Sequence, residues 1–328
     1  MSSVGAQPSS ASDVTWRSDA QSGLLIFAHF AFSYVPVYLA AATGPGLHWI
    51  ALWLWFGLCQ NGVINLMHEC AHGLAFKRAG LNDLLGNWLL APLVLTNFGE
   101  YRKRHWDHHR YLGSLRDPKL VYRTDVRGTR VLLLALRCAV GLEALRRLTE
   151  RPPQAAEDEV KEKGAGLSLR LVLVQAGFCA SIFAVAWAAH GALGAALVAA
   201  VGAYVAIYGY GTASLTVLAA ALRALAEHQI GERAPLVEGD AALRNFHCNA
   251  FTRLVFGAYG FGEHAAHHKQ SNVPYYQLPA LVSELAAQDP RFAPTGGYIG
   301  TMVRLITMEP RSTTARSDPS VAERPADR

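Results

Sequence analysis

The chain of 328 residues contains 51% hydrophobic and 17% charged residues, fewer charges than the roughly 25% usual in soluble domains. This composition excludes a disordered or fibrous chain and argues against an ordinary soluble enzyme. The formal net charge of +5 is compatible with either nucleic acid or a membrane surface as partner, so the positions of the charges must decide between them.

Two long stretches of the chain, Ala20–Met67 and Leu171–Leu222, contain no Asp, Glu, Lys or Arg. Each is more than twice the length of about 20 residues that a helix needs to cross a bilayer. A turn sequence interrupts each stretch, at Thr43–Gly46 in the first and at Ala189–Ala192 in the second. The pattern therefore predicts four membrane spans, near residues 22–42, 48–67, 168–188 and 193–219.

The basic residues predict how these spans are oriented. Arg17 precedes the first span, and all other Lys and Arg residues lie between 77 and 170 or between 223 and 328. Because cytoplasmic loops carry an excess of basic residues, both termini and the middle loop are predicted to be cytoplasmic. The basic charge is then a sign of membrane topology, and nucleic acid is not expected as a partner. A large soluble core is a poor alternative, because such cores rarely lack charges over this length.

The remaining segments complete the predicted domain organisation. Residues 1–16, rich in Ser and Ala, and the polar residues 310–328 are predicted to be disordered tails, leaving 17–309 as the membrane domain. Leu84–Phe98 and Val131–Leu142 are apolar but too short to span, so we expect helices at the interface or packed against a cytoplasmic domain. The five cysteines have no paired spacing, so no disulfide framework is predicted.

Eight of the thirteen histidines lie in three groups at the cytoplasmic side of the predicted spans. Spacings of three and four residues place side chains on one helix face, so each group can direct its imidazoles towards one point. Packing has no use for clustered imidazoles, whereas a metal ion does. The groups, which we call boxes one, two and three, are His68 and His72; His105, His108 and His109; and His264, His267 and His268.

His228 is a candidate ninth ligand, because it follows the fourth predicted span at the same level. Nine imidazoles exceed the four ligands of a typical zinc site and fit two ions, with four or five nitrogens each. Imidazole suits iron, zinc, copper and nickel, and the spacing does not choose among them. The other histidines are interpreted as lying outside the site: His29, His48, His190 and His247.

The three boxes, in this order around two pairs of membrane spans, resemble the histidine boxes of the membrane fatty acid desaturase superfamily. Further similarities are Asn82-Asp83-x-x-Gly86 before box two, Glu227-His228 after the last span, and the segment Val273–Pro279 after box three. The resemblance covers roughly residues 20–285. It implies an all-α membrane protein, with four transmembrane helices in two hairpins and a cytoplasmic helical cap that carries the boxes.

The resemblance also implies a function. Two iron ions (Fe2+) would be held by the nine histidines, and the enzyme would use dioxygen to desaturate a fatty acyl chain taken from the bilayer. The alternative on the same site is a hydroxylase or monooxygenase acting on a lipid, alkane or carotenoid-type substrate. The chain contains no cytochrome-like His-Pro-Gly-Gly motif, so a separate electron donor of the ferredoxin, rubredoxin or cytochrome b5 type is expected. Some relatives carry an Asn ligand where this chain has Ala224.

Four acidic residues are adjacent in sequence to predicted ligands. Carboxylates that accept the second ring N–H of a ligating histidine orient the ring and offset the positive charge of the metal. The candidates for this role are Glu69, Asp107, Glu227 and Glu263.

Two other classes of protein compete with the desaturase interpretation. His68-Glu69-Cys70-Ala71-His72 matches the H-E-x-x-H motif of zinc proteases, but a protease would leave six clustered histidines unexplained. A metal transporter would place ionisable residues inside the spans, where this chain has only His29.

Overall fold

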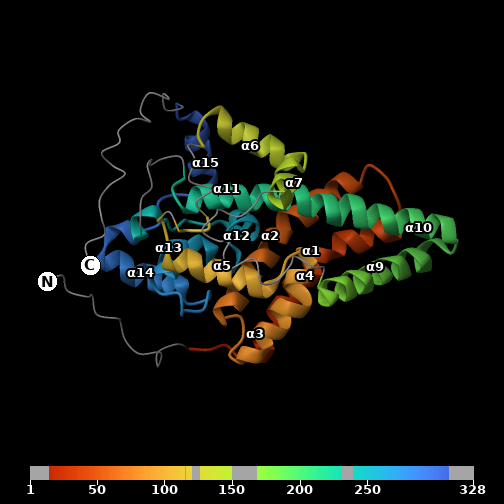
Figure 1. Ribbon diagram of the computed structural model, residues 1–328, viewed down its shortest axis with the longest axis horizontal. Helices are drawn as coiled ribbons and strands as arrows, with labels where there is room; N and C mark the ends of the chain where they lie inside the picture. Colours follow the sequence, from red (N-terminus) through yellow and green to blue (C-terminus); the bar gives the residue numbers. More distant parts are fainter. Residues whose placement is uncertain (1–14, 115, 120–125, 150–167, 231–238, 310–328) are drawn as a thin grey trace.

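The computed structural model describes residues 15–114, 116–119, 126–149, 168–230 and 239–309 (Figure 1). All regular secondary structure within these ranges is helical. Residues 1–14 and the tail predicted at 310–328 lie outside the described residues. Thr15, which falls within the predicted N-terminal tail, accepts a hydrogen bond from Gln277 through its carbonyl oxygen.

Four helices are long and apolar enough to cross a membrane, as the uncharged stretches predict. The first three are α1 (Asp19–Thr43), α2 (Trp49–His72) and α9 (Leu169–His190). The fourth runs from Leu193 to Glu227. It is formed by α10 (Leu193–Gly202), the π-helical turns η5 (Ala203–Gly209) and η6 (Thr212–Thr216), and α11 (Val217–Glu227).

The fourth helix extends beyond its predicted end at residue 219, because α11 packs against α2, α6 and α15. This packing buries Ala219, Leu225 and Ala226 and continues the helix past the last uncharged residue. As a result, Glu227 and His228 lie at the end of a rigid element.

Helix ends are determined locally by capping residues. Ser18 accepts a hydrogen bond from the backbone N–H of Gln21 and so caps α1, and Ser168 caps α9 in the same way. Gly73 ends α2 and Gly191 ends α9 in the left-handed conformation, with φ of 75° and 65°, which glycine adopts without steric cost.

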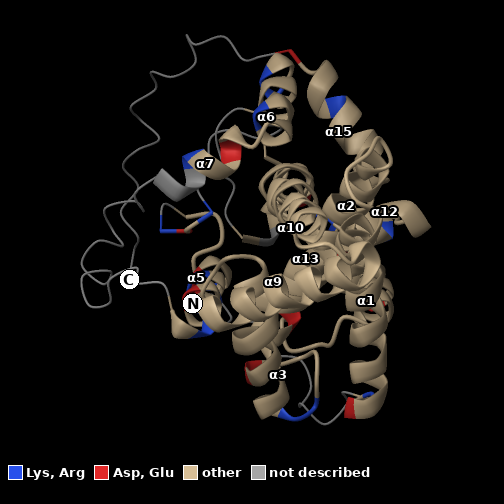
Figure 2. Ribbon diagram, turned by 90° about the vertical axis from the view of Figure 1, so that its right-hand side faces the viewer, with Lys and Arg blue, Asp and Glu red and all other residues tan. Residues whose placement is uncertain are grey.

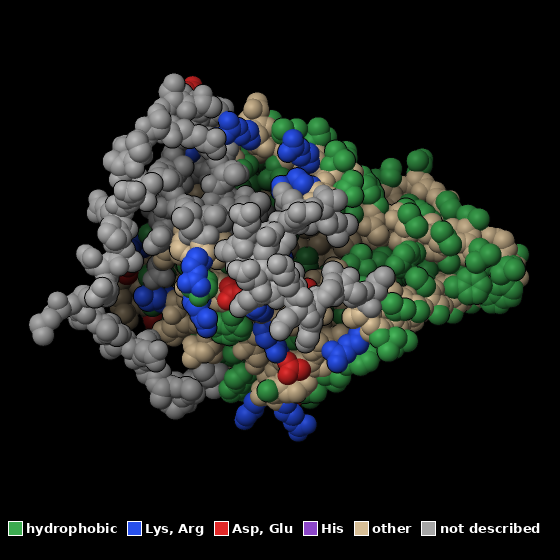
Figure 3. Space-filling view, in the orientation of Figure 1, with side chains coloured by type: hydrophobic (Ala, Val, Ile, Leu, Met, Phe, Trp, Pro, Cys, Tyr) green, Lys and Arg blue, Asp and Glu red, His purple; other side chains and the backbone are tan. Residues whose placement is uncertain are grey.

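The spans form one apolar bundle. α1 packs against α2 and α9, and α10 packs against α9. In Figure 3 the end of the molecule where α9 and α10 meet is covered by hydrophobic side chains and carries no charge on the visible face. An apolar surface of this size on an exposed helical bundle is typical of contact with lipid.

A broken helix lies between α2 and α5, formed by α3 (Ala79–Leu85), η2 (Gly86–Leu90) and α4 (Ala91–Leu93). Its C-terminal end packs among the spans, where the Pro92 carbonyl accepts a hydrogen bond of 2.8 Å from Gln175. The Leu93 carbonyl accepts one of 3.2 Å from Tyr208. Side chains from the spans thus satisfy carbonyls that the helix end exposes, and this part of the predicted interfacial segment lies deeper than expected.

The remaining helices lie beside the bundle and carry most of the charged side chains (Figures 1 and 2). The predicted helix Val131–Leu142 is observed as α6 (Thr129–Ala139) followed by α7 (Leu142–Thr149), both in contact with η6. Leu132, Leu133 and Leu136 of α6 are exposed. The others are α5 (Phe98–Arg110), η7 (Gly239–Ala242), α12 (Ala250–Val255), η8 (Ala258–Glu263), α13 (His264–Lys269), α14 (Leu278–Gln288), η9 (Pro290–Phe292) and α15 (Tyr298–Thr307).

Candidate metal centre

Four elements bring the nine predicted histidines to one region. Box one occupies the last turn of α2, box two the last turns of α5, and box three the whole of α13. His228 directly follows α11. Within the described residues, the nine histidines form two groups, each with ligand nitrogens within 4.8 Å of one another.

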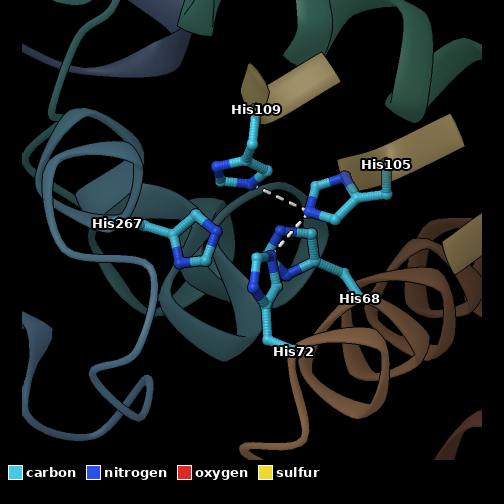
Figure 4. Close-up of side chains that lie close together, drawn as sticks. All are labelled: His68, His72, His105, His109 and His267. Atoms are coloured by element: carbon cyan, nitrogen blue, oxygen red, sulfur yellow. Dashed lines mark hydrogen bonds between the residues drawn. The ribbon is translucent and has the colours of Figure 1, made fainter. Parts of the chain in front are cut away.

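The first histidine cluster consists of five side chains that point towards a common centre (Figure 4). The Nε2 atom of His105 lies 2.6 Å from Nε2 of His72 and 3.0 Å from Nε2 of His109. The rings of His68 and His267 are centred 4.5 Å apart. The cluster therefore combines box one, two residues of box two and one residue of box three.

The second histidine cluster consists of His108, His228, His264 and His268. The Nε2 atoms of His264 and His228 are 3.1 Å apart, and the rings of His108 and His268 are centred 4.9 Å apart. His228 is only 9% exposed and His108 is fully buried. The second cluster is thus the more enclosed of the two.

The two clusters are neighbours, because boxes two and three each contribute to both. His109 of the first cluster stacks on His268 of the second, with ring centroids 4.1 Å apart. In an H-x-x-H-H box the first and last histidines are one helical turn apart and share a face, while the middle histidine points elsewhere. Accordingly, His108 crosses to the second cluster and His267 crosses to the first.

The donor atoms fit metal ions. Both ring nitrogens of His267 and Nε2 of His268 are buried and have no hydrogen-bond partner among the described residues, although burying a polar atom without a partner is costly. Two imidazoles bound at right angles at about 2.1 Å would place their nitrogens about 3 Å apart. The separations of 3.0 and 3.1 Å match this value, whereas the separation of 2.6 Å between His72 and His105 is shorter.

Burial keeps these imidazoles neutral and therefore able to donate a lone pair to a metal. It lowers the pKa of His264, His267 and His268 well below the ordinary histidine range, and neighbouring histidines lower it further. The pKa of His109 falls to about 2, through burial and then through the charges of His72 and Lys119. Desolvation disfavours the protonated ring.

Two of the four predicted carboxylates contact a clustered histidine. Glu69 Oε1 lies 3.5 Å from Nδ1 of His68, and its other oxygen accepts a hydrogen bond from the Tyr275 backbone N–H. Glu227 Oε2 lies 3.9 Å from Nε2 of His264. The hydroxyl group of Tyr298 donates to Glu227 at 2.7 Å, which holds this carboxylate in place.

The other two predicted carboxylates are directed elsewhere. Glu263 is paired with Arg253 at 3.0 Å rather than with a histidine. Asp107 is half-buried, and the described structure shows no hydrogen bond or ion pair between its side chain and a histidine. Adjacency in sequence does not place a side chain on the ligand side of a short helix, because consecutive residues point about 100° apart.

Asp117 is a further buried carboxylate at the site that the sequence did not predict. This carboxylate is 2% exposed, and its Oδ1 lies 2.9 Å from Nδ1 of His108. Oδ2 accepts a hydrogen bond from the Gly113 backbone N–H and Oδ1 accepts one from the Lys119 backbone N–H. The available signal was the turn sequence Leu112-Gly113-Ser114 after box two, which folds the following loop back towards α5.

His247 lies outside both clusters and is exposed. Its backbone N–H donates to the Gly296 carbonyl, so this part of the chain is held by its backbone while the side chain stays away from the site. Ala224 is 9% exposed in α11, one turn before His228, and offers no ligand atom. The assignment of nine ligands without His247 or residue 224 stays a prediction.

Comparison with known proteins identifies the family. The family model for fatty acid desaturases matches residues 47–296, which include all nine clustered histidines. The chain belongs to the fatty acid desaturase family. This result confirms the resemblance seen in the histidine boxes, and it sets aside the zinc protease and metal transporter alternatives.

Short segments of this desaturase-family protein are similar to curated proteins with several activities. It is 32% identical over 99 residues to a Delta(12) fatty acid desaturase of Caenorhabditis elegans, over 29% of this chain and 24% of that protein. It is 30% identical over 82 residues to a beta-carotene ketolase of Haematococcus lacustris, over 24% of this chain and 26% of that protein.

A third relative is a sphingolipid delta(4)-desaturase/C4-monooxygenase of Bos taurus, 35% identical over 82 residues, with 23% of this chain and 25% of that protein covered. The aligned segments thus span about a quarter of each curated relative. Membership of the family supports an oxidoreductase, and the printed activities of the relatives differ.

Proposed function

We propose that this protein is a membrane-bound, dioxygen-dependent di-iron oxidoreductase that desaturates a fatty acyl chain. The observation that carries the proposal is the convergence of nine histidines into two adjacent clusters at the end of an apolar helical bundle. Five and four imidazoles suit two transition-metal ions. The metal ligands proposed are the nine histidines of the two clusters.

The family and the ligand set favour iron as the metal. Two ferrous ions in these clusters would supply the reduction of dioxygen that breaking an unactivated C–H bond requires. For desaturation, the balance is one CH2–CH2 unit, one O2, two electrons and two protons, giving one CH=CH unit and two water molecules. The protein contributes by holding the acyl chain at a fixed position beside the clusters, which is catalysis by orientation.

Residues around the clusters keep the imidazoles in place. Asp117 fixes the ring of His108 through its Nδ1 atom, and the carboxyl groups of Glu69 and Glu227 lie beside His68 and His264. When ionised, these groups would offset part of the charge that two metal ions bring into a buried site.

Oxygenation of a lipid at the same site is the second candidate reaction. It is favoured by two of the relatives, because one is a beta-carotene ketolase and another combines a desaturase with a C4-monooxygenase in its name. In chemical terms the two outcomes differ after the first hydrogen is removed: loss of a second hydrogen gives a double bond, whereas transfer of oxygen gives an alcohol.

Product analysis tests the proposal. The protein should be expressed in a host lacking the activity, and its lipids compared with those of a host expressing a His68→Ala/His267→Ala variant. We expect a new double bond in an acyl chain and about two iron atoms per purified chain. A new hydroxyl group instead would select the second candidate, and one zinc without iron would contradict both.

We also propose that both termini and the metal centre face the cytoplasm, on the basis of the distribution of basic residues. Reporter fusions after Leu112 and after Pro310 are expected to give a cytoplasmic signal, and a reporter inserted within 44–46 an external one. An external signal at Leu112 would place box two on the wrong side and contradict the orientation.

A further inference from the structure

Trp106 connects the first histidine cluster to the molecular surface. Its side chain is 42% exposed, although it lies between two ligands of box two in the sequence. Its ring is centred 4.7 Å from the ring of His72 and 5.7 Å from that of His109. A protein that contacts this indole is therefore separated from two proposed metal ligands only by the Trp106 side chain.

Two exposed basic side chains share the helix face of Trp106, and a third lies in the loop that follows α5. Lys103 and Arg110 are exposed and lie three residues before and four residues after it, which places all three on one face of α5. The Arg110 guanidinium is 6.0 Å from the ring of Tyr111. The Arg116 guanidinium lies 3.9 Å from the centre of the same ring and donates a hydrogen bond to the Tyr111 hydroxyl group.

These five residues, Lys103, Trp106, Arg110, Tyr111 and Arg116, form a surface that we call the α5 patch. It contains three cationic and two aromatic side chains. The acidic residues of α5, Glu100 and Asp107, lie three residues before and four residues after Lys103 and so share its side of the helix, but the three cations against two carboxylates leave this surface with a net positive charge. In Figure 3 basic side chains are visible on the side of the molecule where α5 lies, away from the apolar end.

We propose that the α5 patch is the docking site of the electron donor, a small acidic protein with a one-electron redox centre near its surface. This inference rests on the proposed function, which requires two electrons per turnover from a reductant outside the chain. Each docking event would oxidise the donor by one electron and transfer that electron towards the first histidine cluster, so two events supply one turnover.

The chemistry of the patch fits this partner. Complementary charge accelerates and orients the encounter of two proteins, and electron-transfer complexes use small, transient interfaces. Exposed aromatic residues and arginines are the side chains enriched at the centre of such interfaces. An anionic lipid surface would also attract three cations, but it would make no use of the contact between Trp106 and the ligands.

An acidic plant-type [2Fe–2S] ferredoxin is a suitable probe for a binding test with the iron-loaded protein in nanodiscs of neutral lipid. The variant is Lys103→Glu/Arg110→Glu/Arg116→Glu. A matched control, Arg130→Glu/Arg137→Glu/Arg304→Glu, changes the charge equally on α6 and α15, where the three arginines are exposed. We expect the Kd for oxidised ferredoxin to rise at least about tenfold in the α5 variant, and to stay near the wild-type value in the control.

Turnover with two reductants separates docking from the chemistry of the site. The α5 variant should lose most product formation driven by reduced ferredoxin, but keep that driven by reduced methyl viologen, a small reductant that needs no docking surface. Trp106→Leu should weaken ferredoxin binding, because it removes the most exposed aromatic side chain of the α5 patch. Raising the ionic strength should weaken ferredoxin binding to the wild type, because salt screens exposed charges.

The outcomes are distinguishable. Equal ferredoxin affinity in the wild type and the α5 variant, or affinity independent of salt, would overturn the docking site even if the variant lost iron. Weaker binding of the α5 variant to anionic vesicles, with ferredoxin binding unchanged, would assign the patch to the membrane instead. If the wild type forms no product with either reductant, the proposed function fails, while the binding measurement still tests the patch.

Discussion

His228→Ala is expected to abolish activity and to remove much of the bound iron, whereas His247→Ala should keep most of both. His228 follows directly on α11, and its Nε2 lies 3.1 Å from Nε2 of His264. The second cluster has four histidines, so the loss of one leaves an incomplete set of protein ligands in a buried site. His247 is exposed and belongs to neither cluster, so its removal should leave the ligand set intact.

Iron per chain and product yield should be measured for both variants at matched protein levels in the membrane. The two histidines are a good pair for comparison, because both lie after the fourth span and outside the boxes. Iron loss in His247→Ala with full retention in His228→Ala would mean that the ninth ligand is wrongly chosen. The three boxes would be unaffected by that result.

Asp117→Ala is expected to weaken iron binding about 10- to 100-fold, the range typical for the loss of a partner that orients a metal ligand. The carboxylate holds His108 through Nδ1 at 2.9 Å and also accepts hydrogen bonds from the backbone N–H groups of Gly113 and Lys119. Without it, the ring of His108 can rotate away from the second cluster, and the loop after box two loses its central acceptor.

Asp107→Ala provides the matched control, since it removes the same side chain from the neighbourhood of the same histidine. Asp107 is half-buried and has no contact with a clustered histidine in the described structure, so iron affinity should stay within about threefold of the wild-type value. Affinity can be measured by competition with a chelator of known strength. Equal losses in the two variants would show that Asp117 acts through net charge rather than through its contact with His108.

The spans and the nine candidate ligands could be predicted because each depends on a local rule. A bilayer excludes charge over about 20 residues, so Ala20–Met67 and Leu171–Leu222 are recognisable in the sequence alone. A helix repeats every 3.6 residues, so the spacings of box two and box three indicate clustered imidazoles. These rules require no knowledge of which helices pack against one another.

The supporting carboxylates could not be predicted by the same means. Asp117 reaches His108 through a loop whose path depends on hydrogen bonds to Gly113 and Lys119, and nothing in the spacing of box two points to it. Asp107 directly precedes His108 in the sequence and was predicted for that reason, but its side chain lies on a face of α5 that makes no contact with the clustered histidines in the described structure. Contacts made through loops depend on the whole fold, whereas helical spacing does not.

The sequence alone thus determined the family resemblance, the four apolar helices and the identity of the histidines that gather. Only the tertiary structure decided how they divide: His267 joins boxes one and two, while His108 joins His228 and the rest of box three. The physical reason is that helical periodicity sets which side chains leave one helix together. The neighbours that they meet are set by the packing of α2, α5, α11 and α13 around a shared centre.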